Sequence, residues 1–265
     1  MTDKKRFQNR VALITGAGSE KGIGFATARI LHAGGASLAI TDMSRRIHDR
    51  AKSLAADDRN VKSYTADLTR RQQASKLVDA VLNDFGRVDI LVNCAGMVEA
   101  GGTYTETNMA DLDPLAWDKD IDINLNTCFN TTRLVLPHMI SERRGRIVNV
   151  ASVTGPLVSN PGATGYSAAK AGIVGMSRSL AIEVAKFNIT VNSVAPGWID
   201  TASSTREEQV AAQNTPMGRA GTPSEVGDLI AFLASDASAY ITGQMIVIDG
   251  GNTIQEYKGP SEFYY

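Results

Sequence analysis

Short apolar runs alternate along this chain with longer stretches whose apolar residues recur at helical spacing. Such runs are typical of buried strands, and several of the longer stretches end at glycines, which stop helices. Repeated strand–helix alternation predicts an α/β fold with a doubly wound, mainly parallel sheet and helices on both faces. The expected strands are residues 11–14, 37–41, 61–65, 89–93, 146–151, 190–194 and 244–248, and the expected helices are residues 24–33, 70–85, 117–139 and 165–187, with a charged helical stretch ending at about residue 57.

Bulk properties narrow the class of protein. We expect residues 1–265 to form one domain, because no linker, composition shift or internal repeat divides them. A net charge of −1 gives no electrostatic basis for binding nucleic acid. No apolar run is long enough to cross a membrane, and the basic opening lacks the apolar segment of a secretory signal, so we expect a cytoplasmic protein. Cys94 and Cys128 have neither disulfide-framework nor metal-ligand spacing; we expect small buried thiols and no metal.

A glycine cluster at residues 15–24, Thr-Gly-Ala-Gly-Ser-Glu-Lys-Gly-Ile-Gly, joins the first expected strand to the first expected helix. Glycines let a backbone turn tightly and approach a pyrophosphate, and the start of a helix offers free amides and the positive end of the helix dipole. The cluster therefore predicts a dinucleotide site, with Gly16, Ser19, Gly22 and Ile23 as contacts.

The second expected strand is followed by Asp42. A carboxylate at this place accepts hydrogen bonds from both hydroxyls of an adenosine ribose and repels a 2′-phosphate. Asp42 therefore predicts NAD(H) as the cofactor. Lys21 stands just before Gly22 in the glycine cluster, and Arg45 and Arg46 follow Asp42 within one turn; any of them could instead attract a phosphate.

Tyr166 and Lys170 stand four residues apart in the expected helix 165–187, so their side chains share one face. An ammonium group one turn away stabilises a phenolate, and a phenol so placed can exchange a proton with an alcohol. Ser152, directly after the expected strand 146–151, could hold the same substrate oxygen. These three residues predict an oxidoreductase of alcohols and ketones.

Markers along most of the chain resemble those of the short-chain dehydrogenase/reductase family, whose members have a Rossmann fold. The resemblance runs from Asn9 to about Gly251, and the markers stand in family order: Thr-Gly and Gly-Ile-Gly within 15–24, Asp67, Asn-Cys-Ala-Gly at 93–96, Asn124, Ser152, Tyr166 with Lys170, Pro-Gly at 196–197, and Asp-Gly-Gly at 249–251.

This resemblance implies a role for each matching residue. Asn124, Ser152, Tyr166 and Lys170 would be the catalytic tetrad, with Lys170 also binding the nicotinamide ribose and Asn124 holding a water that links Lys170 to solvent. Tyr166 and Lys170 therefore count among the cofactor contacts as well. The other implied cofactor contacts are Asp67 and Leu68 at the adenine, Asn93, Ala95 and Gly96 in the middle of the cradle, and Pro196, Gly197, Ile199 and Thr201 around the nicotinamide.

The chain departs from the family pattern at two places. Five residues separate Gly16 from Gly22, where the family has three. Gly18 taken as the first glycine restores that spacing but loses the Thr-Gly pair, so we favour an insertion with Gly16 retained. Cys94 replaces the usual asparagine or small residue, and we expect no catalytic consequence.

The substrate side carries fewer signals. The polar segment of about 202–223 resembles the family's mobile substrate loop. Met97, Val153, Leu157 and Trp198 are candidate pocket walls, and Arg206 could meet a substrate carboxylate, although a solvated arginine is the simpler interpretation.

Assembly is expected to be homotetrameric. Small residues on the Tyr166 helix permit close helix contact, and the family resemblance implies the same state. The tail at 252–265 ends in aromatic residues and is expected to pack on a neighbouring subunit.

The sequence thus predicts NAD(H)-dependent hydride transfer to and from a small secondary alcohol or ketone. The main alternative is an NADPH-dependent reductase of 3-oxoacyl groups on acyl carrier protein. Such enzymes dock an acidic carrier on basic residues, and Arg143, Arg144 and Arg146 could serve, but Phe187 stands where a basic residue would be expected. A catalytically inactive cofactor-binding scaffold is a distant alternative, because all four tetrad positions are intact.

Overall fold

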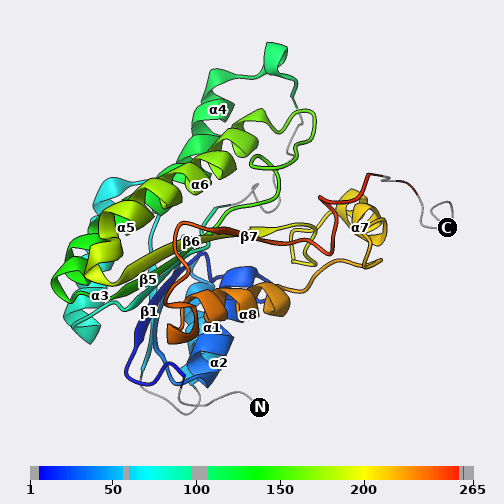
Figure 1. The fold of residues 1–265 in the computed structure, drawn as a ribbon. Coiled ribbons are helices and arrows are strands. Elements are labelled where there is room, and N and C mark those ends of the chain that lie inside the picture. Colours follow the sequence, from blue (N-terminus) through cyan, green and yellow to red (C-terminus); the bar gives the residue numbers. More distant parts are fainter. Residues whose placement is uncertain (1–5, 56–59, 97–106, 257–258, 260–265) are drawn as a thin grey trace.

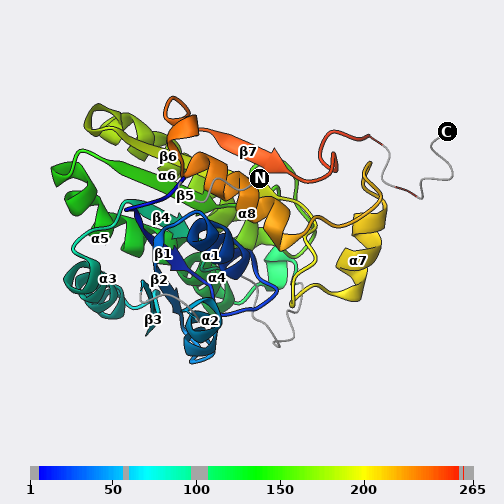
Figure 2. The same cartoon turned by 90° about the horizontal axis from the view of Figure 1, so that it is seen from below.

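A computed structural model of the protein describes residues 6–55, 60–96, 107–256 and 259. Seven strands form one sheet in the order β3-β2-β1-β4-β5-β6-β7, and every neighbouring pair is parallel (Figures 1 and 2). The strand order reverses between β1 and β4, as in a doubly wound Rossmann fold, and the predicted fold class is confirmed. The strands are β1 (Val11–Thr15), β2 (Ser37–Asp42), β3 (Val61–Thr65), β4 (Ile90–Asn93), β5 (Gly145–Val150), β6 (Ile189–Pro196) and β7 (Met245–Ile248).

Helices cover both faces of the sheet (Figure 1). On one face α1, α2 and α8 pack on the strands, and on the other α3, α5 and α6 do so. The helices are α1 (Ile23–Ala33), α2 (Ile47–Leu54), α3 (Arg71–Phe85), α4 (Pro114–Ile121), α5 (Thr127–Ser141), α6 (Thr164–Val184), α7 (Arg206–Gln213) and α8 (Pro223–Leu233).

The sheet separates two apolar cores because successive strand residues point to opposite faces. Leu13 and Ile14 are both fully buried, yet Leu13 belongs to the core under α3, α5 and α6, and Ile14 to the core under α1 and α8. Burying a side chain of this size contributes about 1.5–3 kcal/mol. Central strands apolar on both faces are therefore held firmly, which fixes the edge where their carboxyl ends emerge.

The expected helix 117–139 differs from the structure. The helical segment starts earlier, at Pro114, and ends later, at Ser141, and a π-helical turn at Asp122–Asn126 separates α4 from α5. In this turn the Thr127 N–H donates to the carbonyl of Asp122, five residues back. Such a turn holds one more residue than an α-helical turn, and the sequence prediction did not include it.

Helices α7 and α8 were not among the expected elements. Each begins with a capping box, Thr205 with Glu208 and Thr222 with Glu225, in which side chain and backbone at both positions exchange hydrogen bonds. Helix α7 lies within the segment predicted as a substrate loop.

Candidate active site

Most of the predicted site residues lie at or directly after the ends of β1 to β6, which are successive neighbours in the sheet, and the others lie in the π-helical turn and in α6. Hydrogen bonds tie the strand ends together. The Thr15 hydroxyl accepts the backbone N–H of Cys94 (3.1 Å) and of Ala95 (2.9 Å), and the Val153 N–H donates to the Pro196 carbonyl (3.0 Å). The structure therefore brings these loops to one edge of the sheet, where ligands of open α/β sheets bind.

The glycine loop turns closely against the loop that follows β4. Gly16 has φ +68°, and a Cβ there would lie 2.7 Å from the backbone of Cys94 and Ala95. Only glycine fits this left-handed, crowded position. Gly16 and not Gly18 thus makes the tight turn, which favours the alignment with an insertion.

The inserted residues form a compact turn before α1. The Gly22 N–H donates to the carbonyl of Ser19 (3.1 Å), and the Glu20 carboxylate pairs with Arg50 of α2 at 2.8 Å. Gly22 is the N-cap of α1, which has no side-chain cap and no acidic residue in its first turn. The free amides that open α1 at Ile23 are therefore left for an anion, as a pyrophosphate requires.

Asp42 lies under this loop and holds it. Its Oδ2 accepts the N–H of Gly18 at 3.0 Å and its Oδ1 accepts the N–H of Ser44 at 2.8 Å. A Cβ on Gly18 would lie 2.4 Å from the Asp42 Cγ, so the carboxylate touches the loop backbone. Lys21 of the glycine loop and Arg45 and Arg46, which follow Asp42, have exposed side chains.

The predicted adenine contacts follow β3. Asp67 Oδ1 accepts both the N–H (3.0 Å) and the hydroxyl (2.7 Å) of Thr69, and the Asp67 N–H donates to Gln73. Leu68 is buried in the core, and its carbonyl accepts the Asn130 side chain at 2.9 Å. The Leu68 side chain is thus committed to packing, which leaves its backbone N–H as the group that can face a base.

Asn93 has its side chain in the interior. Its Nδ2 donates to Thr132 (2.9 Å) and Asn149 (2.8 Å), and its Oδ1 accepts the Thr131 hydroxyl (2.6 Å). Asn149 in turn donates to Ser177 of α6 at 2.8 Å. Asn93 therefore belongs to a buried polar network, and any cofactor contact at this position must come from its backbone or from the Ala95 and Gly96 that follow.

Tyr166 and Lys170 lie on the first turns of α6. The Lys170 Nζ is 5.5 Å from the centre of the Tyr166 ring and donates to the carbonyl of Val150, the last residue of β5, at 3.1 Å. Lys170 is only 4% exposed, so its position is fixed by packing and by this hydrogen bond. Ser152 lies two residues beyond Val150, and its Oγ accepts the Thr154 N–H at 3.1 Å, which leaves the hydroxyl proton free to donate.

Asn124 lies within the π-helical turn, 1% exposed. Its Nδ2 donates to the carbonyl of Asp120 at 3.2 Å, and its buried Oδ1 has no hydrogen-bond partner among the described residues. Buried polar atoms are nearly always satisfied, so this oxygen marks a place that accepts a hydrogen bond from a further group. Widened helical turns of this kind recur at functional sites.

The segment predicted to clamp the nicotinamide follows β6. The Gly197 N–H donates to the Ile248 carbonyl (3.0 Å), and a Cβ on Gly197 would lie 2.7 Å from that of Asp249. Ile199 bridges to Gly221, and the Thr201 hydroxyl lies 2.9 Å from that of Ser203. Pro196, Gly197, Ile199 and Thr201 thus lie on a backbone anchored to the end of β7.

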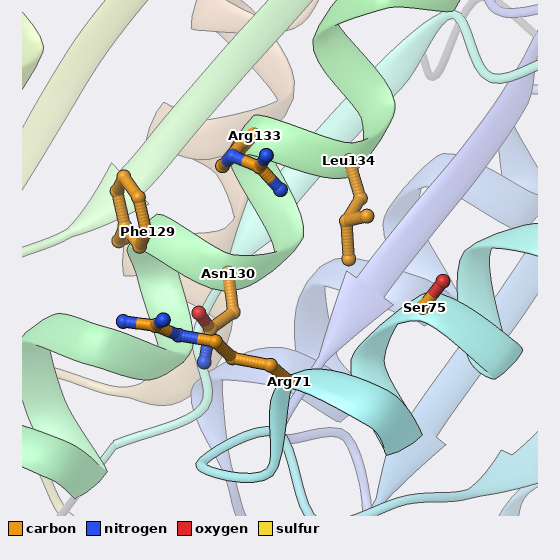
Figure 3. Close-up of a pocket in the computed structure, with 6 residues that line it drawn as sticks. All are labelled: Arg71, Ser75, Phe129, Asn130, Arg133 and Leu134. Atoms are coloured by element: carbon orange, nitrogen blue, oxygen red, sulfur yellow. The ribbon is translucent and has the colours of Figure 1, made fainter.

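The candidate substrate residues have mixed surroundings. Val153 is buried, Trp198 is partly buried, and Leu157 and Arg206 are exposed, Arg206 as the first residue of α7. Met97 lies outside the described residues. A cavity of about 330 Å³ between α3 and α5, lined by Arg71, Ser75, Phe129, Asn130, Arg133 and Leu134, contains none of the predicted site residues (Figure 3).

Both cysteines are free. Burial raises the pKa of the Cys94 thiol to about 11 and that of Cys128 to about 12, so neither is a thiolate at neutral pH. Within the described ranges, no three His, Cys, Asp or Glu side chains gather as a metal would need, and no helix is long and apolar enough to span a membrane.

Five features of the site fit a dinucleotide. The glycine turn leaves no room for side chains, the start of α1 has uncapped amides, a carboxylate ends β2, and a buried lysine and an unpaired amide oxygen lie beyond β5 and β4. The carboxyl-terminal edge of the sheet therefore offers groups that suit the pyrophosphate, the ribose and the nicotinamide of such a cofactor.

Comparisons with known proteins agree with this geometry. A family model described as enoyl-(acyl carrier protein) reductase matches residues 16–253. The 3-oxoacyl-[acyl-carrier-protein] reductase FabG of Thermotoga maritima is 41% identical over 254 residues, which cover 94% of this chain and 100% of that protein. The (2S)-[(R)-hydroxy(phenyl)methyl]succinyl-CoA dehydrogenase subunit BbsD of Thauera aromatica is 38% identical, covering 93% and 98%. The crystal structure of gox2181 superposes with a TM-score of 0.87 at 35% identity, covering 96% of this chain and 99% of that one.

A family match over most of the chain, relatives near 40% identity over their full length, and the edge geometry all lead to one conclusion. The chain belongs to the short-chain dehydrogenase/reductase family of oxidoreductases, which act on CH–OH groups with a nicotinamide cofactor.

Proposed function

We propose that this protein transfers a hydride between NAD(H) and a small secondary alcohol or ketone. The observation that carries the cofactor choice is the Asp42 carboxylate, oriented by the backbone N–H groups of Gly18 and Ser44. Two donors from rigid backbone hold the charge in place, and its remaining lone pairs are free for ribose hydroxyls. A 2′-phosphate about 4 Å away would cost roughly 1–4 kcal/mol, or about one to three powers of ten in affinity.

The basic residues nearby offer little compensation. Lys21, Arg45 and Arg46 are exposed and flexible, and charge pairs between such side chains contribute only about 0–1 kcal/mol. Arg50, the better-ordered arginine of α2, is engaged by Glu20 at 2.8 Å and lies over the Phe25 ring. The balance of charge at the ribose therefore favours the unphosphorylated cofactor.

A bound nicotinamide would supply or accept the hydride of the proposed reaction. Ser152 donates its free hydroxyl proton to the substrate oxygen and orients it. The Tyr166 phenol gives a proton to that oxygen in reduction and takes it in oxidation. The buried Lys170 ammonium would stabilise the phenolate and hold the nicotinamide ribose. Asn124 would accept at Oδ1 a hydrogen bond from a water that links Lys170 to solvent.

Cofactor choice is tested by measuring kcat/KM for NAD(H) and NADP(H) with one saturating substrate. We expect at least a tenfold preference for NAD(H), and Asp42→Ala should reduce it mainly by weakening NAD(H). Lys21→Ala is the matched control and should change the preference by less than twofold. Equal efficiency with both cofactors, or a preference for NADP(H), would refute the proposal and assign the phosphate to the basic side chains.

A second candidate function is reduction of 3-oxoacyl groups on acyl carrier protein. It is favoured by the activity for which the Thermotoga maritima relative is named. The surface that would dock an acidic carrier argues against it, because Arg146 is buried and pairs with Asp236, Arg144 also pairs with Asp236, and the Arg143 guanidinium lies 5.9 Å from the Phe187 ring. The two functions are separated by measuring kcat/KM for a 3-oxoacyl group on acyl carrier protein and for the same group on a short thiol. A much higher kcat/KM with the carrier protein would favour the second function.

We further propose a homotetramer with closed symmetry. Helix α6 is rich in small residues, nothing lies within 4 Å of a Cβ built on Gly175, and Ile182 is 83% exposed on the same helix. A large apolar side chain beside a small-residue surface is a sound basis for helix contact between subunits. The solution mass tests this proposal, and a monomeric mass would refute it. The proposed substrate loop, about 202–223, and packing of the tail 252–265 on a neighbour stay predictions. The tail's aromatic end lies outside the described residues.

A further inference from the structure

Helix α6, which carries Tyr166 and Lys170, has no N-terminal cap of its own. Its N-cap residue, Ala163, has no side chain for the purpose, and no acidic residue stands in its first turn. The amide groups that open a helix need partners, and the positive end of the helix dipole favours a negative charge. The sequence around Tyr166 therefore leaves the start of this helix without its usual stabilisation.

A carboxylate from another helix supplies what is missing. The Asp120 carboxylate of α4 lies against the backbone of Gly165, the residue before Tyr166, and its charge therefore stands beside the Tyr166 N–H in the first turn of α6. Helices α4 and α6 lie side by side beyond the sheet (Figure 1), so the contact joins two elements far apart in the sequence. Partial burial raises the pKa of the Asp120 carboxyl, and the Tyr166 N–H and the charge of Lys119 oppose that shift.

Gly165 makes this approach possible. A Cβ on Gly165 would lie 2.5 Å from Oδ2 and 2.9 Å from Cβ of Asp120, closer than side-chain atoms pack. The residue directly before Tyr166 must therefore lack a side chain for the carboxylate to lie beside the Tyr166 N–H.

Asp120 also contacts a predicted catalytic residue directly. Its backbone carbonyl accepts the Nδ2 of Asn124 at 3.2 Å, which fixes the orientation of the Asn124 amide and leaves Oδ1 as its free acceptor. One residue thus lies beside the Tyr166 N–H with its side chain and binds Asn124 through its backbone, immediately before the π-helical turn.

We propose that Asp120 is a positioning residue that sets the Tyr166 phenol in register with Asn124 and Lys170. The proposal rests on the function proposed above and adds a residue to it. Displacing a catalytic group by about 1 Å can reduce turnover by about 100-fold. Loss of the Asp120 contact frees the first turn of α6 and should therefore act on kcat, while the cofactor cradle at the ends of β1 and β2 stays intact.

Four variants test this inference. Asp120→Ala should lower kcat about 10- to 100-fold with the dissociation constant for NAD(H) changed less than twofold. Asp120→Asn keeps an oxygen beside the same N–H and should retain at least a third of kcat. Gly165→Ala displaces the carboxylate without removing it and should lose as much kcat as Asp120→Ala, with no further loss in the double variant. Asp118 is an exposed aspartate of the same helix, and Asp118→Ala is the control, which should have the kcat of the wild type.

The outcomes test the role of Asp120 separately from the proposed hydride-transfer function. Wild-type kcat in Asp120→Ala, or failure of Asp120→Asn to retain activity, would overturn the positioning role. Additive losses in the double variant would also overturn it, because Asp120 and Gly165 would then act separately. Circular dichroism shows whether each variant folds, and if Asp120→Ala does not, Asp120→Asn and Gly165→Ala decide. Full activity of Tyr166→Phe would instead remove the proposed function, whatever Asp120 does.

Discussion

Replacing Gly18 by alanine tests the link between the glycine loop and Asp42. A Cβ at this position would lie 2.4 Å from Cγ and 2.5 Å from Oδ2 of Asp42. Real Cβ contacts essentially never fall below 3.0 Å, so either the carboxylate or the loop must move. Both movements break the hydrogen bond from the Gly18 N–H to Asp42 Oδ2.

The expected size of the effect follows from two opposing contributions. A hydrogen bond to a charged group contributes about 1.5–3 kcal/mol. Replacing glycine by alanine restricts the unfolded chain and returns about 0.4–1 kcal/mol. The free energy of unfolding should fall by about 1–2 kcal/mol, which corresponds to a decrease in Tm of roughly 2–8 °C for a chain of this length.

A double-mutant cycle with Asp42→Ala shows whether the carboxylate is the cause. Thermal unfolding is followed by circular dichroism without cofactor and at one fixed protein concentration, because assembly affects Tm. With alanine at 42 the new methyl group has room, so Gly18→Ala should be neutral or slightly stabilising. An equal decrease in Tm in both backgrounds would refute the reasoning. The preference for NAD(H) over NADP(H) should also fall in Gly18→Ala alone.

Three further predictions concern chemistry, packing and acid stability. Tyr166→Phe should lower kcat about 100- to 10,000-fold and leave cofactor binding, measured by fluorescence titration, nearly unchanged; activity within a few-fold of wild type would remove Tyr166 from the mechanism. Asn93→Ala should lower the free energy of unfolding by about 2–4 kcal/mol in urea, since three buried partners lose their hydrogen bonds, and a change below about 0.5 kcal/mol would contradict the network. The Arg219 guanidinium lowers the pKa of Glu225 to about 2, so the pair stabilises the fold above the carboxyl's ordinary pKa and loses this contribution as the pH falls toward 2; Glu225→Gln should cost less than about 1 kcal/mol at pH 7 because the pair is exposed, and should unfold no more easily than wild type near pH 2.

Strands and the catalytic edge could be predicted because their signals are local. A buried parallel strand must be apolar on both faces, which yields short continuous runs such as β1, and β3 has the expected bounds of residues 61–65. Carboxyl ends of neighbouring strands must meet at one edge, so the order of elements along the chain is enough to place Gly16, Ser152 and the segment after Pro196 together.

The elements that were missed divide into two kinds. Helices α7 and α8 had a readable signal in the capping-box spacing of Thr205 with Glu208 and Thr222 with Glu225, and α8 also carries buried apolar residues at helical spacing, Val226, Ile230 and Leu233. The π-helical turn and the Asp120–Gly165 contact had none. Both depend on how α4 packs against α6, and a one-dimensional pattern does not contain the distance between two helices.

The buried network around Asn93 restricts how this protein can change over evolutionary time. Asn93, Asn149 and Ser193 are direct neighbours across β4, β5 and β6, and Ser177 of α6 joins the last two. Altering one member leaves another polar group buried and unpaired, so such positions can drift only through simultaneous changes. If the proposed substrate segment 202–223 does contact substrate, a laboratory library meant to change substrate preference should vary that segment and leave the buried layer of Asn93, Asn149 and Ser193 unchanged.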